Sequence, residues 1–164
     1  HLAALMENKG RLLSLDIHAW KLDELKRRAR RNGVANLETR AITSTKIIKR
    51  LAGKADRLLL DVPCSGLGVL RRNPDAKWKL SPETIDRLVA EQDKILSGYS
   101  RMVKVGGKMV YATCSILPRE NERRVEHFLT TEAGQGWEVE SSQSYLPQRE
   151  GYDGFFVCRL SKTR

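Results

Sequence analysis

Residues 56–66 have the sequence DRLLLDVPCSG, in which a strand pattern leads into a loop. Its continuous apolar run is bounded by charged residues, which predicts a parallel strand over 56–62 that is buried on both faces. Pro63, Cys64 and the turn residues after them end this strand in a long loop. The first residues beyond the strand are therefore the place to look for chemistry, because α/β sheets bind ligands at the carboxyl ends of their strands.

Short apolar runs alternate with longer amphipathic ones on both sides of this strand. Further strands are predicted over 11–17, 37–42, 108–113, 136–140 and 155–160, the last two as an edge hairpin. Helices are predicted over 19–31, 45–52 and 118–130, with another from Pro82 to a stop at Gly106-Gly107. On the helix over 19–31, Trp20 is expected to share one apolar side with Leu22, Leu25 and Ala29. Alternation of this kind predicts an α/β fold with a mostly parallel sheet and helices on both faces.

Composition limits the function. The 164 residues suggest one domain, and their net charge of +10 favours a polyanionic partner such as nucleic acid. Three cysteines are too few for a disulfide framework, and no apolar run approaches the roughly 20 residues of a membrane span. We therefore expect a soluble, cytoplasmic protein.

Two cysteines follow two predicted strands. Cys64 comes after the strand over 56–62, and Cys114 after the strand over 108–113. If these strands are neighbours, their backbones lie about 5 Å apart and both thiols face one crevice. Inert buried thiols, or a redox pair without C-x-x-C spacing, are the alternatives.

Two thiols beside a carboxylate suit one reaction well. Carbon-5 of a pyrimidine is a poor nucleophile until a thiolate adds to carbon-6. Carbon-5 can then attack an electrophilic methyl group, and loss of its proton expels the thiolate, which is covalent catalysis. The attacking thiol must ionise, although a free cysteine has a pKa of about 8.5.

Three segments carry a family resemblance. Residues 61–78 (DVPCSGLGVLRRNPDAKW), 106–122 (GGKMVYATCSILPRENE) and 151–160 (GYDGFFVCRL) resemble the RNA cytosine carbon-5 methyltransferases, most closely the bacterial small-subunit ribosomal RNA branch. The similarity extends from about residue 1 to residue 162. It implies a Rossmann-like class I fold and S-adenosylmethionine as cofactor. It also implies an RNA substrate, with ribosomal RNA as the first candidate and tRNA as the second.

The resemblance also implies roles for four residues. Cys114, in Thr-Cys-Ser, would be the nucleophile, and Cys64, in Pro-Cys-Ser, would assist release of the methylated product. Asp61 would lie between the methionine end of the cofactor and the cytosine ring. Asp16 would accept hydrogen bonds from the ribose hydroxyls, unless it only forms a strand-end turn or a helix cap.

The sequence departs from the family at two points. The Gly-rich turn that cradles the methionine part of the cofactor, with its Gly-Gly-Lys, would precede His1 and is not in this sequence. Ile42 occupies a position where the family usually has an acidic residue near the adenine. We therefore interpret residues 1–164 as a catalytic domain truncated at its N-terminus, without its first strand.

From this we expect the 164-residue chain to bind S-adenosylmethionine weakly or not at all, and to be inactive by itself. The reason is that half of the cofactor pocket would be missing. Calorimetry measures this directly, and binding in the micromolar range would refute the expectation.

The loop after Cys64 is the predicted RNA contact. Arg71 and Arg72 follow that cysteine and would bind phosphates of a single-stranded or loop RNA. Trp78 either braces this loop, which we favour, or stacks on a base. The surface would extend to Arg119, Arg123 and Arg124, diluted there by Glu120, Glu122 and Glu126.

The sequence leaves two competing interpretations. A non-catalytic RNA-binding module with the same fold is the alternative, favoured by the missing Gly-rich turn and disfavoured by the retained Asp61, Cys64 and Cys114. An amino-group methyltransferase would need Asn or Asp before Pro-Pro and an aromatic residue, and that pattern is absent. The cysteine spacing predicts no metal site, and His18 and His127 are interpreted as structural.

Overall fold

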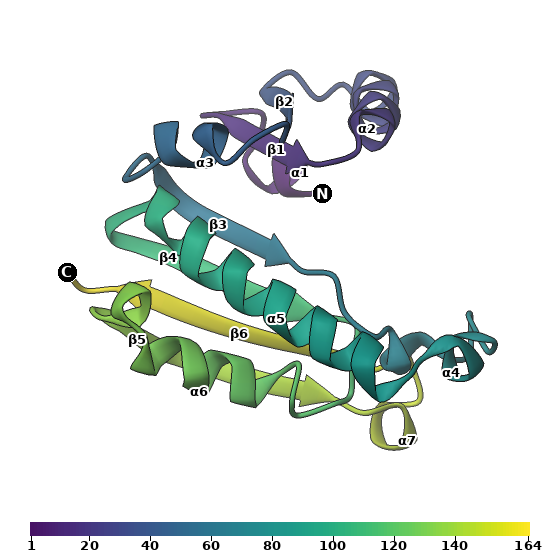
Figure 1. Cartoon of the computed structure of the whole chain (residues 1–164). Helices are drawn as coiled ribbons and strands as arrows, with labels where there is room; N and C mark the ends of the chain where they lie inside the picture. Colours follow the sequence, from purple (N-terminus) through teal and green to yellow (C-terminus); the bar gives the residue numbers. More distant parts are fainter. The chain divides into compact units, whose positions relative to one another are not determined.

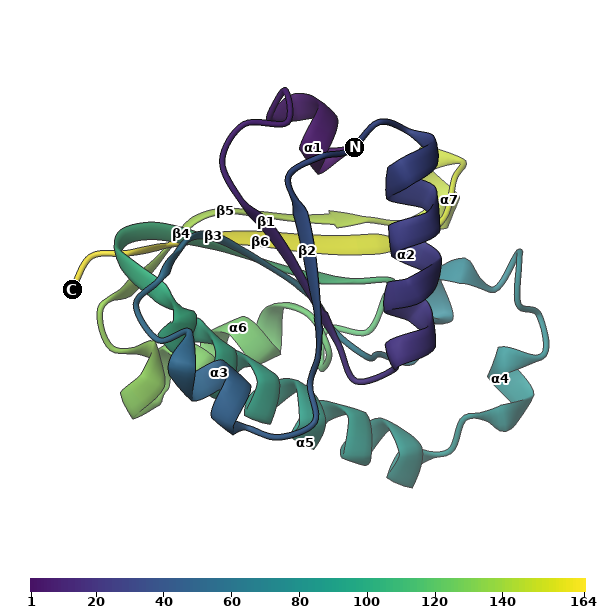
Figure 2. The ribbon, with the colours of Figure 1, turned by 90° about the horizontal axis from the view of Figure 1, so that it is seen from above.

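The computed structural model describes all residues, 1–164, and the chain forms two compact units, residues 1–47 and 48–164 (Figure 1; Figure 2). Each unit combines strands with helices, as the alternating sequence predicts. None of the helices has both the length and the apolar character that crossing a bilayer requires.

The first unit is built on a parallel strand pair. Its elements are α1 (Leu2–Leu5), β1 (Leu12–Asp16), α2 (Ala19–Arg31) and β2 (Leu37–Ala41), and α3 (Lys46–Arg50) spans the boundary. The pair is in parallel register, with Asp16 opposite Ala41. Helix α2 packs on it through the buried Leu22 and Ala29, whereas Trp20 is 67% exposed. The apolar side predicted to include Trp20 is therefore narrower than expected.

The second unit is a four-stranded sheet with the order β3-β4-β6-β5. Its strands are β3 (Ala55–Asp61), β4 (Val103–Thr113), β5 (Trp137–Tyr145) and β6 (Phe155–Lys162). Its helices are α4 (Ala76–Lys79), α5 (Pro82–Tyr99), α6 (Glu122–Thr130) and α7 (Pro147–Glu150), with 3₁₀ turns η1 (Leu67–Val69), η2 (Ser100–Met102) and η3 (Glu132–Gly134). Strands β3 and β4 are parallel, while β6 runs antiparallel to both β4 and β5. The predicted pairing of the last two strands is thus confirmed.

The core of the second unit lies between the sheet and helices α5 and α6, which cover the same face (Figure 1; Figure 2). Tyr111 and Phe156 meet edge to face with ring centroids 6.3 Å apart, and Phe128 and Trp137 do so at 6.2 Å. Burial of each large apolar side chain stabilises the fold by roughly 1.5–3 kcal/mol. This core fixes the carboxyl ends of β3 and β4.

Gly106 and Gly107 lie inside β4, so the prediction that they end the preceding helix is wrong. The helix ends at Tyr99, and η2 leads directly into the strand. Gly106 has φ of +77°, and a Cβ on Gly107 would lie 2.5 Å from a methyl carbon of Val103. The glycines permit an irregular strand start, consistent with the register shift where β3 pairs with β4.

The helix predicted over 118–130 begins only at Glu122. A turn precedes it, in which the backbone N–H groups of Asn121 and Arg123 both donate to the carbonyl of Pro118. The turn buries the side chains of Glu120 and Asn121. The short helices α1, α4 and α7 were not predicted, because one helical turn has almost no periodicity to detect.

Candidate active site

The two thiols lie in contact at the ends of neighbouring strands. Strands β3 and β4 pair in parallel with Asp61 opposite Ala112, which confirms the expected adjacency. Cys64 and Cys114 follow these strands, and their Sγ atoms are 3.4 Å apart. Both residues are partly exposed.

Contact between the thiols makes their acidities unequal. A hydrogen bond from Cys64 lowers the pKa of Cys114 to about 7, against the opposing effect of burial. The same hydrogen bond, followed by burial, raises the pKa of Cys64 well above its ordinary value. The shared proton therefore stays on Cys64, and Cys114 carries the thiolate near neutral pH.

This inequality predicts a pH-dependent labelling pattern. The thiolate is the form that alkylates, so the iodoacetamide reaction of Cys114 should rise with pH and reach half its maximum near pH 7. Cys158 is 1% exposed and burial raises its pKa to about 11, so it should stay unlabelled in the folded protein. Mass spectrometry of the reduced protein measures both rates. A Cys114 midpoint near pH 9 would contradict the assignment.

A buried polar cluster joins the two cysteine turns. Glu120 is 0% exposed, whereas the sequence had placed it on the charged surface, and that expectation is wrong. Its carboxylate accepts hydrogen bonds from Ser65, Ser115 and Gln92. None of these four residues was identified from the sequence as part of a site.

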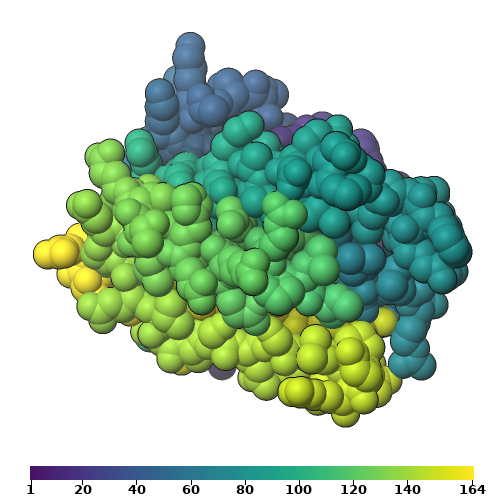
Figure 3. Space-filling model, turned by 60° about the horizontal axis from the view of Figure 1, so that its bottom comes forward, coloured from purple at the N-terminus to yellow at the C-terminus, as the bar shows by residue number.

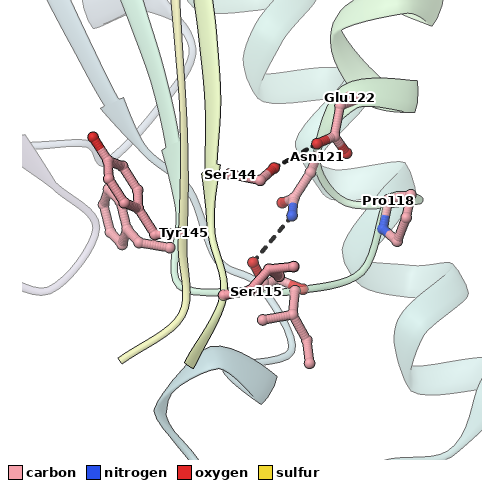
Figure 4. Close-up of a pocket in the computed structure, with 9 residues that line it drawn as sticks. Ser115, Pro118, Asn121, Glu122, Ser144 and Tyr145 are labelled. Atoms are coloured by element: carbon pink, nitrogen blue, oxygen red, sulfur yellow. Dashed lines mark hydrogen bonds between the residues drawn. The ribbon is translucent and has the colours of Figure 1, made fainter. Parts of the chain in front are cut away.

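Asn121 holds the turn after Cys114. Its Oδ1 accepts from the hydroxyl of Thr113 at 2.6 Å. Its Nδ2 donates to the carbonyl of Ser115 at 3.0 Å, as Figure 4 shows. The sequence contained a signal for this role. Asn121, Val125 and Phe128 have helical spacing and are all buried, so Asn121 lies on the inward side.

Backbone contacts connect three distant segments at the turn that contains Cys114. The N–H of Gly68 donates to the carbonyl of Cys114 at 2.9 Å, and the N–H of Gly154 donates to the carbonyl of Gly68 at 2.7 Å. A Cβ on Gly68 would lie 2.2 Å from the Gly154 oxygen and 2.7 Å from the Cys114 oxygen. Only glycine fits at this crossing of backbones.

Gly68→Ala is therefore expected to lower the free energy of unfolding by about 1–3 kcal/mol, because the added methyl group forces backbone atoms apart. It should also slow the alkylation of Cys114, whose carbonyl moves with the turn. Thermal unfolding followed by circular dichroism measures the first effect. Gly98→Ala is the matched control, since that helical glycine has nothing within 4 Å and the change should be neutral or stabilising. Equal melting temperatures for the two variants would contradict this account.

The predicted RNA-contacting arginines have protein partners. Arg71 donates to the carbonyl of Gly151 at 2.7 Å, and Nε of Arg72 lies 2.8 Å from the carboxylate of Asp153. These contacts attach the loop after β3 to the connection between β5 and β6, and the two segments lie side by side in Figure 3. Trp78 is 80% exposed, so it does not brace the loop as we favoured.

The two predicted cofactor carboxylates lie in different units. Asp61 is exposed at the end of β3. Asp16 ends β1, where its Oδ1 accepts from the N–H of His18 at 2.7 Å and its Oδ2 lies 3.9 Å from Nζ of Lys21. The strand-end turn weighed for Asp16 is therefore present and uses one of its oxygens. Ile42 follows β2, and its N–H donates to the Asp16 carbonyl.

A small cavity of about 180 Å³ opens beside the turn after β4 (Figure 4). Its walls come from the turn after β4 and from the facing ends of β5 and β6, and they include Ser115, Pro118, Asn121, Glu122, Ser144, Tyr145 and Phe155. The hydroxyl of Ser144 donates to Glu122 across it. The chain has no group of three or more His, Cys, Asp and Glu side chains placed to hold a metal ion.

The arrangement of strands and strand-end residues defines a Rossmann-like α/β protein of the S-adenosylmethionine-dependent methyltransferase class. The chain belongs to the 16S rRNA methyltransferase RsmB/F family, whose model matches residues 1–161. The resemblance inferred from the cysteine motifs is thereby confirmed.

Individual relatives agree with this family. The chain is 37% identical over 177 residues to the probable ribosomal RNA small subunit methyltransferase B of Synechocystis sp., which covers 99% of this chain and 40% of that protein. The crystal structure of PH0851 matches with a TM-score of 0.92 at 30% identity, covering 99% of this chain and 39% of that one. NSun6 from Pyrococcus horikoshii, solved with SFG, matches with a TM-score of 0.88 at 26% identity, covering 100% and 44%. The chain thus spans about 40% of the length of the curated relative.

Proposed function

We propose that this chain carries the catalytic residues of an S-adenosylmethionine-dependent RNA cytosine carbon-5 methyltransferase that acts on 16S rRNA. The observation that supports this most strongly is the 3.4 Å contact between the two thiols at adjoining strand ends. A packing role would need neither partial exposure nor an acidified cysteine. The names of the relatives, ribosomal RNA small subunit methyltransferase B, support the choice of substrate.

In the proposed reaction Cys114 is the nucleophile. Its thiolate adds to carbon-6 of cytosine, which forms a C–S bond and makes carbon-5 nucleophilic. Carbon-5 then takes the methyl group and carries both a methyl and a hydrogen. Removal of that hydrogen as a proton restores the ring double bond, and the C–S bond breaks to return the Cys114 thiolate.

Cys64 is assigned to this release step. Once the Cys114 sulfur is bonded to carbon-6, it no longer accepts the hydrogen bond that chiefly raises the pKa of Cys64. The acidity of Cys64 therefore increases only after addition. A thiol whose basicity changes within the cycle can pass protons to and from solvent near carbon-5.

The two carboxylates are compatible with the proposed cofactor. When bound, S-adenosylmethionine supplies the electrophilic methyl group. The Oδ2 of Asp16 has only the lysine at 3.9 Å, so it can accept from a ribose hydroxyl. The exposed carboxylate of Asp61 suits the ammonium group of the methionine end. NSun6 from Pyrococcus horikoshii was solved with SFG, an analogue of this cofactor, which supports the proposal.

The RNA is expected to present an unpaired cytosine. A base inside a helix cannot reach a thiol, so the target must be flipped out or lie in a loop. The net charge of +10 favours phosphate binding, and the exposed ring of Trp78 is available for stacking on a neighbouring base. Arg71 and Arg72 remain candidates for phosphate contacts. Each guanidinium group has further N–H donors besides the one that contacts Gly151 or Asp153.

A methylation assay tests the function. The full-length natural protein is incubated with cofactor labelled in its methyl group and with unmodified 16S rRNA, 23S rRNA or tRNA in parallel. We expect label in 5-methylcytosine of 16S rRNA, identified by mass spectrometry of the nucleosides. Transfer to another base or to tRNA alone would refute the substrate or the reaction. Tight RNA binding without transfer would favour the non-catalytic module.

A further inference from the structure

One buried carboxylate contacts both cysteine turns. Oε1 of Glu120 accepts from the backbone N–H of Ser65 at 2.8 Å and from Nε2 of Gln92 at 3.1 Å. Oε2 accepts from the hydroxyls of Ser65 and Ser115, both at 2.5 Å. Four donors from three elements thus converge on a side chain that solvent does not reach.

The partners of Glu120 are the immediate neighbours of the thiols. Ser65 follows Cys64 in the chain, and Ser115 follows Cys114. Gln92 also donates to the carbonyl of Pro63 at 2.9 Å, so the Pro-Cys-Ser turn is held on both sides of its cysteine. Hydrogen bonds through the Glu120 carboxylate therefore connect the turn that contains Cys64 to the turn that contains Cys114.

The position of Glu120 is itself fixed. The hydroxyl of Tyr111, on β4, donates to the Glu120 carbonyl at 2.7 Å, and Tyr111 is fully buried in the core. The next residue, Asn121, donates to the Ser115 carbonyl. Glu120 is therefore fixed relative to the sheet, and its hydrogen bonds fix the positions of both cysteine turns relative to the sheet.

Burying this carboxylate is costly for the fold. No lysine, arginine or histidine forms an ion pair with Glu120, so hydrogen bonds alone compensate for its lost hydration. A well-packed apolar residue would serve stability at least as well. Unlike an apolar residue, the carboxylate forms hydrogen bonds that hold the two cysteine turns in a defined arrangement.

We propose that Glu120 is a positioning residue that sets the separation of the Cys64 and Cys114 sulfur atoms by bridging their turns. The purpose of that separation rests on the proposed function, but the geometric statement depends on the thiols alone. Glu120 does not touch the reacting atoms.

The rate of disulfide formation between the two thiols reports their separation. Diamide oxidises the pair: the two thiols lose two protons and two electrons, an S–S bond forms, and the azo group becomes a hydrazine. The assay uses the full-length natural protein without RNA or cofactor, so it does not depend on methyltransferase activity. Failure of the proposed function and failure of this inference are therefore distinguishable.

Four variants define the result. Glu120→Ala should slow formation of the Cys64–Cys114 disulfide by about tenfold or more, because every bridge is lost. Glu120→Gln should recover most of the rate, since its amide oxygen can accept from the Ser65 N–H and its amide N–H groups can donate to the hydroxyls. Ser65→Ala, which removes one hydroxyl, should give an intermediate rate. Glu126→Ala is the matched control, because Glu126 is exposed on α6, and it should match the natural protein.

Melting curves of the same samples identify variants that fold. A folded Glu120→Ala variant with the natural oxidation rate overturns the proposal, and so does a Glu120→Gln variant as slow as the alanine variant. If Glu120→Ala does not fold, Ser65→Ala decides, and an unchanged rate there also overturns it.

Discussion

Replacing Cys114 by alanine is expected to reduce methyl transfer by at least about 10³-fold, because the covalent step has no substitute. The nearest other thiol, Cys64, follows a different strand and is not placed to take over the addition. Binding of RNA should be almost unchanged. Initial rates with methyl-labelled cofactor and 16S rRNA measure the loss, and filter binding measures the affinity.

Cys158→Ala is the control for a general effect of removing a thiol. That side chain is buried in the core of the sheet, so the variant should lose some stability and keep its turnover number. Normal methylation by Cys114→Ala would remove the assignment of the nucleophile. Equal losses in both variants would indicate damage to the fold instead.

Replacing Cys64 by alanine is expected to trap RNA on the protein. Addition through Cys114 would be slower, because Cys114 loses the hydrogen bond that lowers its pKa, but addition and methyl transfer would still occur. Release would be slower still, so a covalent adduct should accumulate to near one RNA per protein. Denaturing gel electrophoresis with labelled RNA detects it as a band of reduced mobility.

The double variant Cys64→Ala with Cys114→Ala should form no adduct, since the bond is made by Cys114. A persistent adduct in the double variant would mean that another residue attacks the base. Absence of adduct in the single variant, with normal turnover, would exclude Cys64 from the release step.

Local patterns were sufficient to predict most of the elements. The helix over 19–31 was placed at its observed bounds, because its apolar spacing and the Asn32-Gly33 stop are properties of adjacent residues. The prediction that Gly106 and Gly107 end a helix is wrong, because the effect of these glycines depends on pairing between β3 and β4. A glycine pair ends a helix or loosens a strand according to what lies beside it.

The proximity of the two thiols could be predicted from the sequence. The buried hydrogen-bond cluster around Glu120 could not. Parallel strands joined by one helix are commonly neighbours, which was enough to bring Cys64 and Cys114 together. Burial of Glu120 depends on a turn that folds back toward Ser65, 55 residues earlier in the chain. A charged residue in a basic segment gives no local sign of such a partner, so it was assigned to the surface.

The crossing of backbones at Gly68 has a consequence for the order of biosynthesis. Gly154 is made after both Gly68 and Cys114, and its N–H completes the chain of contacts that ends on the Cys114 carbonyl. During translation the Cys114 turn therefore lacks this contact until Gly154 has been made. A chain that stops short of Gly154 therefore does not yet hold Cys114 in its final setting.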